Sequence, residues 1–243
     1  MSRATSPIAG ATGLYGKLPA RGDFITRSLA RPFTDGWDAW LQPAINCSRE
    51  QLGEGWVDIY LTSPLWHFVL PGGLCGPTAM AGVLMPSVDR VGRYFPLTIA
   101  APLNDGAAAA RLPSAMSAWF DWAETLALAC LEDDFDFDGL EETLAEAPAA
   151  DAVCPGGISF SPMGLRTPLA GDAPEIGVQT IADGLLAQAF GRCSLWWTKG
   201  SELVTPTMIA TPGLPRTAGF AALLDGDWDR WGWSAEPARE LSL

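Results

Sequence analysis

The stretch Gly82–Leu97 reads GVLMPSVDRVGRYFPL and carries the strongest fold signal in the chain. An apolar run ends at Pro86, and a second apolar run begins at Tyr94. Proline and glycine between two apolar runs are typical of a loop that joins two strands. We therefore predict strands over Thr78–Met85 and Tyr94–Ala101, joined by a loop that carries three charges.

The charges in this loop have two interpretations. Asp89, Arg90 and Arg93 lie within five residues of one another. An ion pair of Asp89 with either arginine would fix the loop, and an exposed pair of this kind contributes only about 0–1 kcal/mol. Alternatively, the arginines present guanidinium groups to a partner, because their planar fork of donors suits a carboxylate or a phosphate.

A second charged loop lies earlier in the chain. Arg21 and Asp23 flank Gly22 directly after a strand candidate over Gly13–Leu18. We expect this loop and Ser87–Arg93 to meet at one edge of the sheet. Their arginines would then form one recognition surface, or their aspartates would pair with the arginines and hold the loops in place.

The remaining elements follow from the spacing of apolar residues. Further strands are expected over Trp56–Leu61, Leu65–Leu70, Cys193–Thr198 and Val204–Ala210. Helices are expected over Phe33–Gln51 (capped by Thr34 or Asp35 and kinked or split at Pro43), Pro113–Leu131, Asp138–Ala147, Gln179–Phe190 and Thr217–Leu224, and a loop over Gly156–Gly177. Short connections favour antiparallel neighbours, so the pattern indicates an α/β fold with helices covering the faces of a largely antiparallel sheet.

Composition and charge limit the class of function. The chain has 243 residues, 48% of them hydrophobic, which is enough for one large domain or two small ones. Its net charge of −13 argues against binding to nucleic acid or to anionic membranes. Residues 101–146 hold eleven acidic side chains and one arginine, and a solvated helix face is the default interpretation of such a segment.

Cysteine usage and hydropathy indicate the compartment. Five widely spaced cysteines without a C-x-x-C pair are typical of buried thiols in a reducing environment. The chain has no apolar run of about 18–20 residues, so no membrane insertion is expected. We therefore predict a cytoplasmic protein.

Catalytic chemistry has little support in the sequence. His67 is the only histidine, so any Ser–His–Asp or Cys–His mechanism would have to use it. It lies in the alternating run Leu65–Val69, where a structural strand histidine is the favoured interpretation. A hydrolase acting through His67 remains an alternative. No cofactor is predicted, because the glycine-rich stretch Gly72–Thr78 lacks the lysine of a phosphate-binding loop.

One acidic stretch has partial metal-site spacing. Asp134–Gly139 matches the first six positions of an EF-hand loop, but the twelfth position is Ala145 instead of a bidentate glutamate. A calcium-sensing module through Asp134–Asp138 is therefore a second alternative, and no metal ligand is predicted. The simpler interpretation is an acidic loop that caps the helix after it.

Four stretches together resemble one protein family: LYGKLPARGD at Leu14–Asp23, WDxWL at Trp37–Leu41, SPxWxF at Ser63–Phe68, and the whole of Gly82–Leu97. They are similar to the TagF family, accessory proteins of bacterial type VI secretion. The resemblance implies an α/β three-layer sandwich. We expect one such domain over residues 13–233, with a flexible lead-in at 1–12 and a polar tail at 234–243.

The resemblance also implies a function without catalysis. Members of the family are described as repressing assembly or firing of the secretion system after translation, in some cases by binding its forkhead-associated scaffold protein. We expect this chain to act in the same way, by sequestering that scaffold. The residues carried over as partner-binding are those of the two charged loops: Arg21, Asp23, Ser87, Asp89, Arg90 and Arg93.

Overall fold

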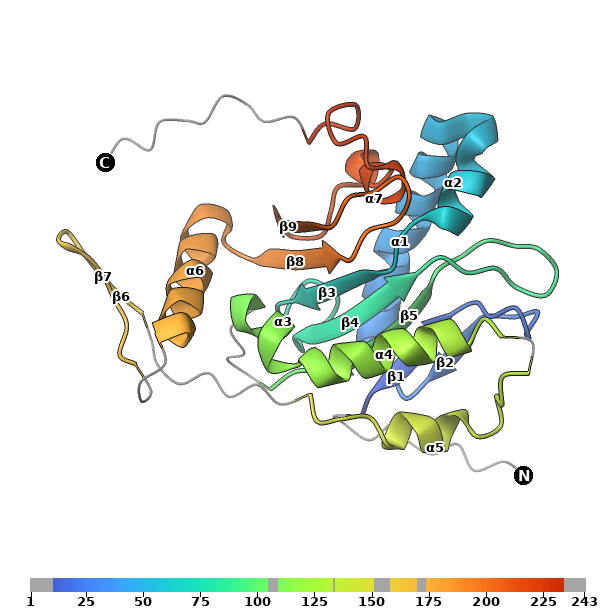
Figure 1. The fold of residues 1–243 in the computed structure, drawn as a ribbon, viewed down its shortest axis with the longest axis horizontal. Coiled ribbons are helices and arrows are strands. Elements are labelled where there is room, and N and C mark those ends of the chain that lie inside the picture. Colours follow the sequence, from blue (N-terminus) through green and yellow to red (C-terminus); the bar gives the residue numbers. More distant parts are fainter. Residues whose placement is uncertain (1–10, 105–108, 133, 151–157, 170–173, 234–243) are drawn as a thin grey trace.

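A seven-stranded sheet forms the centre of the computed structural model, which describes residues 11–104, 109–132, 134–150, 158–169 and 174–233 (Figure 1). The strand order is β2-β1-β5-β4-β3-β8-β9, and each neighbouring pair is antiparallel. The strands are β1 (Gly13–Gly16), β2 (Ile25–Arg27), β3 (Trp66–Leu70), β4 (Met80–Met85), β5 (Leu97–Pro102), β8 (Cys193–Thr198) and β9 (Thr207–Pro212). A separate hairpin joins β6 (Ser159–Ser161) to β7 (Gly164–Arg166).

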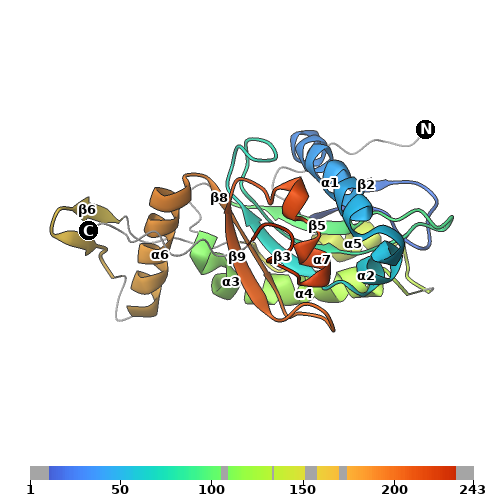
Figure 2. The same cartoon turned by 90° about the horizontal axis from the view of Figure 1, so that it is seen from above.

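Helices cover both faces of this sheet, as the two perpendicular views show (Figures 1 and 2). One face carries α3 (Leu112–Ala115), α4 (Ser117–Ala129) and α5 (Leu140–Ala145), and the other carries α1 (Arg31–Leu52), α2 (Trp56–Thr62) and α7 (Ala222–Asp225). Helix α6 (Pro174–Phe190) packs near the β8–β9 end. Among the described residues, no helix combines the length and the apolar composition that a membrane-spanning helix requires.

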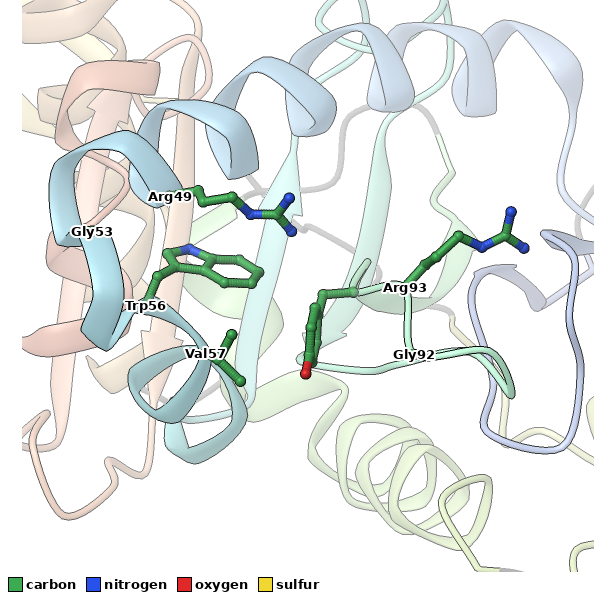
Figure 3. Close-up of a pocket in the computed structure, with 7 residues that line it drawn as sticks. Arg49, Gly53, Trp56, Val57, Gly92 and Arg93 are labelled. Carbon is green, nitrogen blue, oxygen red and sulfur yellow. The ribbon is translucent and has the colours of Figure 1, made fainter.

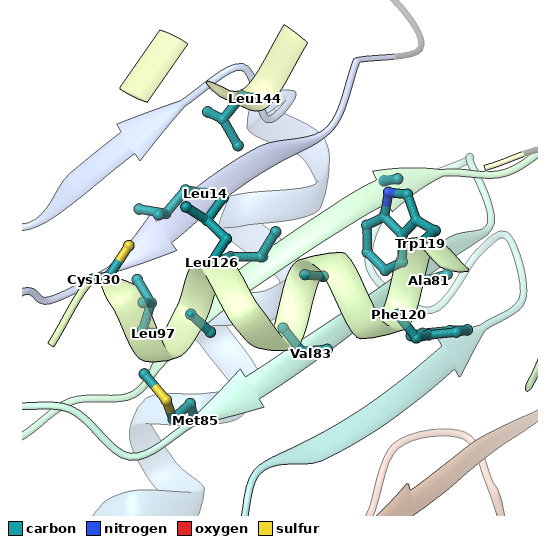
Figure 4. Close-up of a cluster of buried hydrophobic side chains, with 14 of the residues drawn as sticks. Leu14, Ala81, Val83, Met85, Leu97, Trp119, Phe120, Leu126, Cys130 and Leu144 are labelled. Carbon is teal, nitrogen blue, oxygen red and sulfur yellow. The ribbon is translucent and has the colours of Figure 1, made fainter. Parts of the chain in front are cut away.

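The central strands are apolar on both sides, which is why each face needs a helical layer. In β4, Ala81, Val83 and Met85 belong to the core under α4, together with Trp119 and Leu126 of that helix (Figure 4). Alternate residues of β4 such as Leu84 belong to the second core under α1 and α2, which is rich in tryptophan and phenylalanine. The predicted three-layer α/β sandwich is confirmed.

The structure corrects one strand assignment. The predicted strand Trp56–Leu61 is the helix α2. Trp56 and Tyr60, four residues apart, are buried, whereas Val57 and Leu61 are exposed. That burial pattern has helical spacing, and an alternating strand pattern would instead have buried every second residue.

The ends and continuity of other elements also differ from the expectations. Helix α1 is not split at Pro43, which lies on its exposed side, and it begins at Arg31 without a side-chain cap from Thr34 or Asp35. Strand β5 begins at Leu97, because Tyr94 instead makes an isolated bridge with Val88 inside the loop. The predicted loop Gly156–Gly177 contains the β6–β7 hairpin and the first turn of α6, and the three-residue strand β2 was not anticipated.

The structure describes only part of the predicted domain limits. The predicted tail 234–243 and all of the predicted lead-in except residues 11 and 12 lie outside the described residues. Thr12 is buried and its Oγ1 accepts a hydrogen bond from Trp119 Nε1 at 3.1 Å. The single domain over residues 13–233 stays a prediction, although β1 and β9, near its two ends, lie in one sheet.

Candidate functional site

Strand pairing brings the two charged loops together. The first loop leaves β1 and the second enters β5, and these strands are antiparallel neighbours, so both loops lie at the same end of the sheet. The backbone N–H of Arg90 donates to Arg21 O at 2.9 Å. Ser87 Oγ donates to Lys17 O at 2.8 Å. The loops therefore form one continuous surface.

Asp89 is the buried centre of this arrangement. Its side chain is 0% exposed, and its Oδ2 accepts from Lys17 Nζ at 2.9 Å and from Arg93 Nε at 2.7 Å. Its Oδ1 accepts from the backbone N–H groups of Val91 and Arg93 at 3.0 and 2.8 Å. The Arg93 guanidinium also donates to Gly22 O in the first loop. Of the two ion pairs considered from sequence, the structure contains Asp89–Arg93.

The pKa of Asp89 should make stability depend on pH. Burial alone would raise this pKa, but the hydrogen bonds from Arg93, Lys17 and Val91 outweigh burial and hold it well below its usual range. A carboxyl whose pKa is lower in the folded state stabilises the fold fully above its unfolded pKa of about 4, and this contribution is lost as the pH falls toward the folded value. We expect the free energy of unfolding, measured with urea, to decline below about pH 4.

The control for this pH dependence is Asp89→Asn, which removes the titrating group. Its unfolding free energy should decline less between about pH 4 and pH 2 than that of the unmodified protein. Equal declines in the two proteins would show that other carboxyl groups cause the acid sensitivity.

Ser87 makes its hydrogen bonds inside the protein. It is buried, its carbonyl oxygen accepts from Tyr60 OH at 2.9 Å, and its N–H donates to the same hydroxyl at 2.9 Å. Burial raises the pKa of Tyr60, so this phenol stays protonated. Ser87 and Asp89 thus have their polar groups engaged inside the protein, and neither reaches the surface.

The surface beside this buried centre is a hollow of about 460 Å³, here called the arginine hollow. Its charged lining consists of Arg21, Arg27, Arg90, Asp23 and Asp138. The Arg21 side chain is 46% exposed. Among the described residues, no carboxylate lies within ion-pair distance of Arg90. The hollow therefore presents guanidinium donors to solvent on a protein of strongly negative net charge.

Part of the acidic segment lies on the arginine hollow. The Phe137 ring lies 4.2 Å from the Arg21 guanidinium and 5.2 Å from that of Arg27. Asp138 pairs with Arg21 at 3.7 Å, and Glu141 pairs with Arg27 at 3.8 Å. The segment is thus more than a solvated helix face, because an aromatic ring and two carboxylates contact arginines from the first loop and β2.

Three residues of this site were not anticipated: Lys17, Arg27 and Phe137. Lys17 had a usable signal, because it is a single charge inside the apolar run Gly13–Leu18. Arg27 and Phe137 had none, since they are far apart in sequence and meet only in the folded chain. The six predicted residues divide into two groups: Arg21, Asp23 and Arg90 line the hollow, while Ser87, Asp89 and Arg93 hold the loop together.

His67 lies away from this site, in β3 under α4. Its ring is buried, stacks on Trp197 at 5.1 Å, and has Nε2 3.3 Å from Glu124 Oε2 and Nδ1 3.4 Å from Trp197 O. Burial lowers its pKa, and Glu124 opposes that shift. In the part of the chain that the structure describes, both ring nitrogens thus face oxygen acceptors and neither faces a nucleophilic side chain, so the geometry lends the hydrolase alternative no support.

The EF-hand-like stretch has contacts of a different kind. Asp136 Oδ1 accepts from the N–H groups of Asp138 and Gly139 at 3.1 and 3.2 Å, which is the capping role considered from sequence. The described residues contain no group of three or more His, Cys, Asp or Glu that could hold a metal ion. With Arg21 and Arg27 against the stretch, the calcium-sensing alternative gains no support.

Comparisons with known proteins agree with this architecture. Residues 13–147 match the model of the TagF N-terminal domain, described as type VI secretion system-associated. The crystal structure of PA0076 from Pseudomonas aeruginosa PAO1 is similar, with 38% sequence identity and a TM-score of 0.76 over 89% of this chain and 95% of that one. No curated protein matches the chain.

Proposed function

The chain belongs to the TagF family of type VI secretion-associated proteins, and on that premise we propose that it represses this secretion system by binding a protein partner. The partner we propose is the forkhead-associated scaffold protein of the system. Repression would be stoichiometric, because each scaffold molecule bound to this protein is withheld from assembly. No covalent bond is formed or broken. The proposed place of action is the cytoplasm, where free thiols such as those of Cys75 and Cys130 persist.

The arginine hollow is the observation that carries the binding proposal. Arg90 is exposed and lacks a carboxylate partner among the described residues, and Arg21 is held beside it by the Arg90 N–H to Arg21 O hydrogen bond. Guanidinium groups bind carboxylates and phosphates through two parallel hydrogen bonds, which are stronger than neutral ones. Arginine is also enriched in protein interfaces. An acidic or phosphorylated surface of the scaffold would complement the hollow.

The two groups of loop residues would then have separate roles. Arg21 and Arg90 recognise the partner, with Arg27 and Asp23 beside them. Asp89, Ser87 and Arg93 hold the loop in the conformation that exposes Arg90. Substitutions in the first group should weaken binding without unfolding the protein, and substitutions in the second should destabilise the fold.

The experiment is a titration of the purified scaffold from the same bacterium into this protein by calorimetry. We expect Arg90→Glu to raise the dissociation constant at least tenfold, because it replaces a donor by a repelling charge. Arg21→Glu should act in the same direction. Each variant is first checked for an unchanged melting temperature.

The matched control is Arg216→Glu, which makes the same charge change at another exposed arginine, directly before the 3-10 turn Thr217–Gly219. It should bind as the unmodified protein does. If Arg90→Glu and Arg216→Glu bind equally well, the hollow is not the interface. If the unmodified protein does not bind the scaffold, the proposed partner is wrong.

A further inference from the structure

A second open groove lies on the other side of the β4–β5 loop, here called the tryptophan groove. It has a volume of about 500 Å³ and lies between the end of α1, the start of α2 and the loop before β5. Figure 3 shows Arg49 and Trp56 on one wall and Arg93 on the opposite wall. Val57 and Tyr94 complete its lining, with two glycines, Gly53 and Gly92. Of the six partner-binding residues predicted from sequence, only Arg93 lines this groove.

The aromatic part of the groove is held rigidly. Trp56 is only 1% exposed, and its Nε1–H donates to Ser48 Oγ at 2.9 Å. The Trp56 ring stacks on Tyr60 at 4.6 Å and meets the edge of Tyr94 at 5.5 Å. A ligand that binds here does not have to order these rings, so little conformational entropy is lost on binding.

The charged part of the groove consists of two arginines. The Arg49 guanidinium lies 4.4 Å from the centre of the Trp56 ring, and within the described residues it has no carboxylate partner. The Nε–H of Arg93 donates to Asp89 Oδ2, yet the Arg93 side chain remains 57% exposed. Cationic walls beside the apolar surface of Val57 and Tyr94 complement a ligand that combines carboxylates with an apolar side chain.

The chain itself contains an example of this recognition. On the arginine hollow, Phe137 lies against two guanidinium groups while the neighbouring Asp138 pairs with Arg21. Phe137 belongs to the sequence Asp-Phe-Asp-Phe-Asp at residues 134–138. Two arginines, Arg49 and Arg93, also line the tryptophan groove, where no segment of the described chain fills the space.

We propose that the tryptophan groove binds an acidic segment of a protein partner, in which an aromatic or aliphatic side chain is flanked by aspartate or glutamate. The apolar side chain lies against Val57 and Tyr94, which have exposed surface in the groove, and the flanking carboxylates bind Arg49 and Arg93. Arg93 connects this groove to the arginine hollow, because it also donates to Gly22 O there. The inference requires only a protein occupant and does not depend on the identity of the scaffold.

The test uses a fluorescein-labelled peptide with the sequence Asp-Phe-Asp-Phe-Asp and measures fluorescence anisotropy at low salt. We expect saturable binding to the full chain. Arg49→Glu and Val57→Glu should each raise the dissociation constant at least tenfold, since each places a negative charge in the groove. Both positions are exposed, so both variants should fold. A peptide in which asparagine replaces each aspartate should bind at least tenfold more weakly.

The matched control is Arg230→Glu. The Arg230 guanidinium also lies 4.4 Å from a tryptophan ring, that of Trp231, but outside the groove. This variant should bind the peptide as the unmodified protein does. Equal affinity in Arg49→Glu and Arg230→Glu, or no saturable binding at about 1 mM peptide, would overturn the proposal.

A further variant distinguishes the groove from the arginine hollow. If Arg90→Glu weakens peptide binding and Arg49→Glu does not, the peptide binds in the hollow and the groove proposal fails, while the proposed function stands. If Arg49→Glu weakens peptide binding but scaffold binding is absent, the groove proposal stands and the proposed partner fails.

Discussion

Asp89→Asn is expected to lower the free energy of unfolding by about 3–5 kcal/mol, the range found when one member of a buried ion pair is removed. The Lys17 side chain is only 6% exposed, and its ammonium group depends on Asp89 Oδ2 at 2.9 Å. An asparagine amide cannot neutralise that charge, and its NH₂ group would face other donors. Urea denaturation measures the loss, which corresponds to a decrease in melting temperature of roughly 6–20 °C for a chain of this size.

The control for Asp89→Asn is Asp23→Asn, a carboxylate lost from the exposed surface of the neighbouring loop. Its effect should stay within about 0.5 kcal/mol. Adding Lys17→Met to Asp89→Asn should recover part of the loss, because the uncompensated buried charge is then gone. An Asp89→Asn protein as stable as Asp23→Asn would mean that the buried cluster does not hold the loop.

Trp37→Ala is expected to cost about 3–5 kcal/mol, the usual range for truncating a buried aromatic residue. Trp37 is 0% exposed and lies among four other aromatic rings in the core beneath α1: Phe33, Trp40, Phe68 and Trp196. Its Nε1–H also donates to Thr98 Oγ1 at 2.9 Å across 61 residues of sequence. The variant therefore leaves a cavity at the contact between α1 and β5, which urea denaturation would detect.

Two variants show which part of the Trp37 interaction matters. Trp37→Phe keeps most of the apolar contact but leaves the Thr98 hydroxyl without its donor, which should cost about 1–3 kcal/mol. Trp231→Ala removes a tryptophan that is only partly buried near the end of the described chain, and it should cost less than Trp37→Ala. Equal losses in Trp37→Ala and Trp231→Ala would contradict the central role assigned to the α1 core.

The strand arrangement could be predicted where the local pattern was unambiguous. The apolar runs on either side of Pro86 and Gly92 correctly predicted β4, β5 and the charged loop between them. The sequence pattern predicts the wrong class for α2, because Trp56–Thr62 is rich in residues that also favour strands. Only the burial of Trp56 and Tyr60 in the folded chain shows the helical spacing.

Local patterns in the sequence are enough to predict the α/β class, the antiparallel hairpin at the centre of the sheet, the family and the two loops that carry the charged residues. These features depend on residues that are close together in the chain. Which of these charges are buried and which are exposed depends on contacts between distant parts of the chain. Asp89 is bound to Lys17, which lies 72 residues earlier, whereas Arg90, its direct neighbour in sequence, points to solvent. Arg49 and Arg93 are 44 positions apart in sequence and line the same groove. Such contacts arise from the pairing of β1 with β5 and from the packing of helices on the sheet, and no local pattern of residues encodes them.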